Sequence, residues 1–153
     1  MKFLVTKELE QNRLLTLQIL LLTGILTLFL FSDIVLHHYQ VGLTPVQALE
    51  TILGNEEAFL EPILLPALLE RIHIDIFISM ITLLLLVIIY IRISKNGKNK
   101  MIHLAFLSAI LAPFSLLLGY FYGEMFVYVW LVMFVLWHLC ALYFSLFIFR
   151  KLL

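Results

Sequence analysis

Four long apolar stretches constrain the fold of this chain more than any other feature of its sequence. They cover approximately residues 15–36, 72–93, 102–122 and 126–149. Each stretch has about the 20 residues that an α-helix needs to cross the hydrocarbon core of a bilayer. In hydrocarbon the backbone must satisfy its own hydrogen bonds, and apolar runs of this length do so as helices. We therefore predict an all-α integral membrane protein, a four-helix bundle.

The composition agrees with a protein that is dissolved in lipid. Of the 153 residues, 63% are hydrophobic and 13% are charged, which is too few charges for the surface of a soluble domain. We expect a single four-span domain over residues 1–153, with the first apolar run kept as a mature anchor because no A-x-A type cleavage site follows it. The net charge of zero argues against a nucleic-acid partner and leaves the lipid bilayer as the expected surroundings.

The basic residues predict how the bundle is oriented. Nine of the ten lie on one side of the predicted spans: Lys2, Lys7, Arg13, Arg92, Lys95, Lys98, Lys100, Arg150 and Lys151. Only Arg71 falls on the other side, which carries most of the acidic residues. Because basic residues concentrate in cytoplasmic segments, we expect both termini in the cytoplasm. The expected location is a bacterial inner membrane, with the acidic face in the periplasm.

The longest connection, residues 37–71, is the predicted outer loop and contains signals for a short helix. Thr44, Pro45 and Gln47 form a capping-box pattern with proline at the first helical position, and Gly54 supplies a stop. The intervening apolar residues recur at helical spacing, which predicts a short amphipathic helix on the membrane surface or on the bundle. Pro66 is well placed to begin the second long helix.

No Walker, Rossmann or G-x-S-x-G pattern is present, so nucleotide binding and serine-hydrolase chemistry have no support. The remaining candidates for chemistry are histidines and carboxylates. These residues favour an electron-transfer or accessory subunit over a stand-alone enzyme.

Three histidines are predicted at a shared depth near the outer face. His37 and His38 end the first span, and His73 begins the second. A haem b between the two helices would take one imidazole from each, with Arg71 as a partner for a propionate. Adjacent residues on a helix point about 100° apart, so the sequence does not decide which of His37 and His38 turns inward. The alternative is that these histidines are hydrated at the interface.

A non-haem metal site is a second interpretation of the same region. Glu70 and His73 have the Glu-x-x-His spacing of carboxylate-bridged metal sites in helical bundles, and His37 or His38 would add a ligand. A di-iron site needs two such motifs, and only one is present, so a homodimer would have to supply the second.

Two aspartates, Asp33 and Asp75, lie about one turn inside their spans. An unpaired carboxylate at that depth is costly and usually faces a partner or water. Arg71 is expected to pair with one of them, with a haem propionate, or with a surface glutamate.

His138 lies halfway along the fourth span, where an imidazole needs a partner. It could be a five-coordinate haem ligand or a hydrogen-bond donor to a quinone. The favoured interpretation is a contact between helices, to a hydroxyl group such as that of Ser79, Thr82 or Ser108.

Aromatic residues concentrate in the second half of the chain: Tyr120, Phe121, Tyr122, Phe126, Tyr128, Trp130 and Trp137. We expect an aromatic belt at the membrane boundary, with a haem or quinone pocket as the alternative.

Three functions fit these residues. The first is a small membrane protein like cytochrome b, or a haem-bearing anchor subunit of a respiratory complex, that passes electrons near the periplasmic face. The second is a cofactor-free accessory subunit that packs against other membrane subunits or forms a homo-oligomer. The third is metal or proton handling by the outer histidines and carboxylates.

Overall fold

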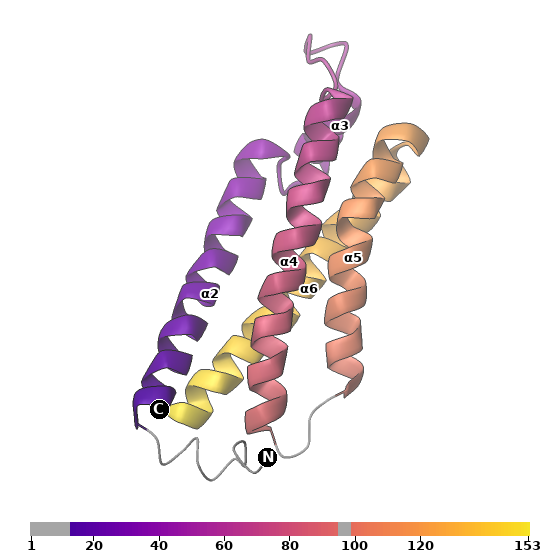
Figure 1. Ribbon diagram of the computed structural model, residues 1–153. Coiled ribbons are helices and arrows are strands. Elements are labelled where there is room, and N and C mark those ends of the chain that lie inside the picture. The colour runs from indigo at the N-terminus through magenta and orange to yellow at the C-terminus, as the bar shows by residue number, and fades with distance from the viewer. Residues whose placement is uncertain (1–12, 95–98) are drawn as a thin grey trace.

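The computed structural model describes residues 13–94 and 99–153, and almost all of them are helical. The helices are α2 (Arg13–Gln40), α3 (Pro45–Leu53), α4 (Leu65–Ile93), α5 (Asn99–Tyr122) and α6 (Glu124–Leu152) (Figure 1). Within the described residues there is no strand, only an isolated bridge between Asn55 and Leu60. The predicted all-α bundle is confirmed. Lys2, Lys7, Lys95 and Lys98, which contribute to the predicted orientation, lie outside the described residues.

Four of these helices, α2, α4, α5 and α6, are long and apolar enough to cross a membrane, with mean hydropathies between 2.1 and 2.7. The three longest have 28 or 29 residues, which corresponds to about 42–44 Å at the usual rise per residue. A hydrocarbon core is about 30 Å thick, so their end turns extend beyond it. This is why the helices continue past the predicted apolar runs. Helix α4 begins at Leu65, next to Pro66, as expected.

Helix α6 organises the bundle. It runs at a slant behind the other long helices and packs against α2, α4 and α5 (Figure 1). The closest partnership is the antiparallel hairpin of α5 and α6, which Gly123 joins alone with a positive φ of 98°. A Cβ atom on Gly119 would lie 2.8 Å from Cγ2 of Val127, so the two helices approach as closely as glycine allows. By contrast, α2 packs chiefly on α6 and has few contacts with α4.

The core combines small residues on α5 with large ones on its neighbours. Ala105, Ala109 and Ala112 are buried on one face of α5, and Trp130 and Phe134 of α6 are also buried. Small side chains allow helices in a membrane to approach and gain van der Waals contact. The outward faces carry large apolar side chains, as contact with lipid requires.

Helix α3 closes one end of the bundle, called here the α3 end. Thr44 caps it, since its Oγ1 accepts a hydrogen bond of 3.3 Å from the Gln47 amide, and Gly54 ends it with a φ of 79°. Ala48 and Ile52 are fully buried, whereas Val46 is 64% exposed. The predicted amphipathic helix is confirmed, and its apolar side packs on α5 and α6.

Candidate functional site

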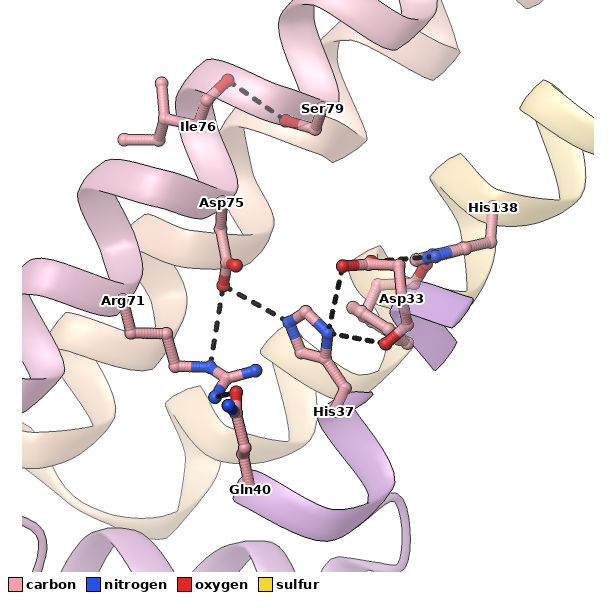
Figure 2. Close-up of polar contacts among 9 residues, drawn as sticks. Asp33, His37, Gln40, Arg71, Asp75, Ile76, Ser79 and His138 are labelled. Carbon is pink, nitrogen blue, oxygen red and sulfur yellow. Dashed lines mark hydrogen bonds and ion pairs between the residues drawn. The ribbon is translucent and has the colours of Figure 1, made fainter. Parts of the chain in front are cut away.

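Polar side chains from three helices converge inside the bundle. Asp33 and His37 lie one turn apart on α2, Arg71 and Asp75 lie one turn apart on α4, and His138 comes from α6 (Figure 2). Residues four apart share a face of a helix, so each pair points in one direction. With Gln40, which is exposed at the end of α2, these six residues are called the buried polar network.

His37 lies at the centre of the buried polar network, and its side chain is 3% exposed. Its Nδ1 donates to the backbone carbonyl of Asp33 at 2.9 Å. Its Nε2 lies 3.2 Å from Oδ2 of Asp75, which connects α2 to α4. The ring also lies against Phe134, with 4.5 Å between the ring centroids. Both nitrogens of this imidazole therefore have partners within the protein.

His138 extends the network into the middle of α6. Its Nδ1 donates to the carbonyl of Phe134 at 2.9 Å, and its Nε2 lies 3.1 Å from Oδ2 of Asp33. That second contact is at ion-pair distance but lies out of line for a regular hydrogen bond. His138 makes a contact between helices, as favoured from the sequence, but its partner is the carboxylate of Asp33 and not a hydroxyl group. Ser79 and Ser108 donate to backbone carbonyls of their own helices. The slant of α6 brings the middle of this helix to Asp33 instead.

Arg71 connects the network to the α3 end. Its Nε lies 3.7 Å from Oδ2 of Asp75, and its Nη1 donates to Oε1 of Gln40. The predicted pairing of Arg71 with an aspartate is thus confirmed for Asp75. Contacts run without a break from Gln40 and Arg71 to Asp75, His37, Asp33 and His138 (Figure 2).

The other predicted site residues do not join this network. His38, His73 and Glu70 are exposed, and no contact links His73 to His37. Among the described residues no group of three or more His, Cys, Asp or Glu side chains is arranged to hold a metal ion. Within the described residues of one chain, His37, His38, His73 and Glu70 are therefore not gathered into a metal site, and a site shared by two copies stays a prediction.

A haem fits this arrangement poorly, because its expected imidazoles do not face one another. His37 uses both ring nitrogens on protein partners, and His73 is on the surface. The ring nitrogens of His138 are directed to Phe134 and Asp33. Haem binding by this chain stays a prediction from the sequence.

A cavity of about 510 Å³ lies beside the buried polar network. Its polar wall is formed by Asp33, His37, Gln40, Glu70, Arg71 and Asp75. Its apolar wall includes Phe29, Ala109, Ala112, Pro113, Trp130, Phe134 and Trp137. The volume is in the range of about 300–1,000 Å³ that is usual for small-molecule sites.

The cavity opens between α2 and α4. Leu36 of α2 and Ile74 of α4 line it, and these residues are 49% and 46% exposed. Few contacts join the two helices, which leaves room for a mouth at this seam. Leu36 and Ile74 give the mouth an apolar border, and the exposed Gln40 and Glu70 give it a polar border nearer the α3 end.

Two aromatic residues were interpreted differently from the sequence. Trp130 and Trp137 are buried at 1% and 4% exposure and line the cavity, so the expected belt at the membrane boundary does not include them. For Trp137 the sequence signal was its position near the middle of the fourth apolar stretch, where a belt residue does not belong, whereas Trp130 lies only about one turn from the start of that stretch.

Comparison with known proteins gives the chain a family. A family model described as a transmembrane helical domain, Aq_1264_TM, matches residues 42–153. The chain belongs to this family. The match covers α3 to α6 and contains Arg71, Asp75 and His138, whereas Asp33 and His37 precede it. No curated protein and no solved structure matches the chain.

Membership in a family of transmembrane helical domains agrees with the four apolar helices, and the protein is an integral membrane protein in contact with the bilayer. In such proteins, ionisable residues inside the spans are costly and mark functional sites. The buried polar network meets that description, because it places two aspartates and two histidines inside a bundle of apolar helices. It offers hydrogen-bond donors, acceptors and exchangeable protons to whatever enters the cavity.

Proposed function

We propose that this protein is a quinone-binding subunit of a membrane electron-transfer system, which takes quinone or quinol from the bilayer into the cavity between α2 and α4. One observation supports the proposal above all others: a cavity with a polar wall and an aromatic wall reaches the surface beside the exposed apolar residues Leu36 and Ile74. A quinone is an apolar ring with two carbonyl oxygens and an apolar tail, and its quinol has two hydroxyl groups in their place. The cavity has matching chemistry for each part.

The polar wall suits the head of such a molecule in both redox states. Arg71 donates hydrogen bonds and has no acceptor, as a quinone carbonyl requires. Asp75 accepts hydrogen bonds, as a quinol hydroxyl requires. Both side chains line the cavity, and the Gln40 amide beside them can do either.

The apolar wall suits the ring and the tail. Trp130, Phe134 and Trp137 present aromatic surface to the cavity, and aromatic rings gain about 0.5–1.5 kcal/mol from offset or edge contacts beyond their buried area. Small side chains at Ala109 and Ala112 leave the space that a ring needs. The mouth at Leu36 and Ile74 lets the tail remain among the lipid chains.

We propose a bacterial inner membrane as the location, with the α3 end outward. Within the described residues, Arg13, Arg92, Lys100, Arg150 and Lys151 all lie at or near helix ends opposite α3, which supports a cytoplasmic position for that end. The cavity would then serve the periplasmic half of the membrane. Electron exchange needs a partner subunit with a redox centre of its own.

The test uses the two tryptophans of the chain, which both line the cavity. Purified protein in quinone-free detergent is titrated with a short-tailed benzoquinone while tryptophan fluorescence is recorded. We expect saturable quenching, because a bound ring contacts the fluorophores directly. An isoprenoid alcohol of the same tail length, which lacks the ring, should compete weakly.

The control variants lie on one helix. Ala112→Phe fills the cavity and should abolish saturable quenching, while Ile110→Phe adds the same ring on a lipid-exposed position and should leave it intact. Quenching that stays linear in the quinone concentration, or that is equal in both variants, would show partition into detergent and overturn the proposal. If Ala112→Phe fails to fold, competition between quinone and isoprenoid alcohol in the unmodified protein decides.

A further inference from the structure

We propose that the buried polar network is a proton-holding site with two shared protons, one between His37 and Asp75 and one between His138 and Asp33. The proton nearer the α3 end exchanges with the cavity. This inference goes beyond quinone binding, and it does not depend on whether the cavity holds a quinone.

The argument begins with the inner nitrogen of each histidine. Nδ1 of His37 lies 2.9 Å from the carbonyl oxygen of Asp33, and Nδ1 of His138 lies 2.9 Å from that of Phe134. A carbonyl oxygen only accepts hydrogen bonds, so each Nδ1 must carry a hydrogen. The helix backbone, four residues earlier, thereby fixes the same tautomer in both rings.

The outer nitrogens then face carboxylates without a hydrogen of their own. In a neutral imidazole with hydrogen on Nδ1, the Nε2 atom is an acceptor. Nε2 of His37 is 3.2 Å from Oδ2 of Asp75, and Nε2 of His138 is 3.1 Å from Oδ2 of Asp33. Two acceptors at this distance repel one another, so each contact needs a proton, on the imidazole or on the carboxyl group. Between His37 and Asp75 the proton makes a hydrogen bond, and between His138 and Asp33, whose contact is out of line, it makes an ion pair. The network therefore holds two protons when its contacts are intact.

The charges around the network distinguish the two protons. With both present, the His37–Asp75 and His138–Asp33 pairs are neutral, and Arg71 leaves one positive charge. Loss of the proton between His37 and Asp75 leaves an Asp75 carboxylate beside Arg71, at 3.7 Å, and no net charge. Buried charge is costly in a membrane protein unless it is paired.

Other groups around the cavity do not change the net charge of the network by direct contact. Glu70 of α4 lines the cavity but is exposed, and Gln40 of α2 is polar without being titratable. The α5 residues that line the cavity, Ala109, Ala112 and Pro113, carry no charge. From α6, His138 is the titratable group among the lining and network residues.

The two protons also differ in position. The pair of His37 and Asp75 lies next to Arg71 and Gln40, at the end of α2. The pair of His138 and Asp33 lies deeper, near the middle of α6. Asp33 contacts both rings, since its Oδ1 is 3.4 Å from Nδ1 of His37. The two pairs are thus separated by one side chain, that of Asp33.

Nitrogen NMR of the histidines tests the inference in quinone-free protein. The chain is labelled with ¹⁵N-histidine in lipid nanodiscs, and resonances are assigned with single His→Gln variants. We expect His37 and His138 to keep hydrogen on Nδ1 at every pH, including after deprotonation. His38, His73 and His103 are exposed, and they serve as internal references for the ordinary tautomer with hydrogen on Nε2. Conversion of His37 and His138 to that ordinary tautomer would overturn the inference.

Two variants provide the second readout, the number of protons released in a titration from about pH 6, where carboxyl groups in water are already ionised, to strong base. Asp33→Asn removes the carboxylate that faces Nε2 of His138, so this contact no longer needs a proton, and the variant should release one proton fewer than Glu70→Gln. Asp75→Asn should do the same at His37 and serves if Asp33→Asn does not fold. Glu70→Gln is the matched control, because it removes an exposed carboxylate at the cavity edge. Equal proton release from the aspartate variants and this control would also contradict the inference.

Discussion

Nε2 of His138 and Oδ2 of Asp33 lie 3.1 Å apart and join the middle of α6 to α2. This contact matters for the assembly because α2 has few contacts with α4. His138 is 3% exposed and Asp33 is 13% exposed, so water cannot fully replace either side chain as a partner of the other.

The pair of Asp33 and His138 should show a measurable coupling energy. In a double-mutant cycle of Asp33→Leu and His138→Leu, we expect the double variant to lose about 1–2 kcal/mol less unfolding free energy than the two single variants lose together. The reason is that either single change leaves a polar group unpaired inside the bundle. Unfolding in mixed micelles measures the four free energies. Strict additivity would mean that the two residues do not interact.

The close approach of α5 and α6 should make Gly119 intolerant of a side chain. Gly119→Ala places Cβ 2.8 Å from Val127 Cγ2, and overpacking of this kind costs about 1–3 kcal/mol of unfolding free energy. Gly24→Ala on α2 is the control, since nothing lies within 4 Å of its Cβ. That variant should match or exceed the parent in thermal unfolding, because alanine favours a helix over glycine by about 1 kcal/mol. Equal effects of both changes would contradict the packing described.

Helix α3 should depend on one buried side chain. Ile52 is fully buried, and Ile52→Ala should cost about 2–5 kcal/mol. Val46→Ala, on the same helix at 64% exposure, should have almost no effect. Hydrogen exchange of the α3 amides distinguishes loss of docking from global unfolding. Protection that survives in Ile52→Ala would show that α3 does not rely on this contact.

The proposed orientation makes opposite ends of the bundle reactive from opposite sides of the membrane. In a Cys140→Ala background, Phe59→Cys places a thiol at a position that is 93% exposed beyond α3, and Lys151→Cys places one near the end of α6. A membrane-impermeant maleimide added to whole spheroplasts should label the first and spare the second. The reverse pattern would invert the proposed topology.

Much of the fold was predictable from the sequence because hydrocarbon leaves few options. The apolar stretches predicted four long helices, and Thr44 and Gly54 predicted the bounds of α3, since capping depends on neighbouring residues. The contact between Arg71 and Asp75 was also predictable, because residues four apart share a helical face.

The buried polar network was only partly predictable, because it depends on helix tilt and rotation. The sequence places Asp33 near one end of a span and His138 halfway along another, which suggests different depths. The slant of α6 brings them together, and tilt is set by packing rather than by span length. Likewise, equal depth suggested that His73 meets His37, but rotation of α4 turns Asp75 inward and leaves His73 exposed.

The single-residue connection at Gly123 has a consequence for how the cavity can change size. Ala109, Ala112, Trp130 and Trp137 all belong to the α5–α6 hairpin, whose helices already touch at Gly119 and cannot close further. The opposite side belongs to α2 and α4, which are loosely joined. We expect a larger occupant to widen the seam between α2 and α4, and an outward movement of α2 would lengthen the distance from Asp33 to His138. The size of the molecule in the cavity is then coupled to the distance between this carboxylate and this imidazole.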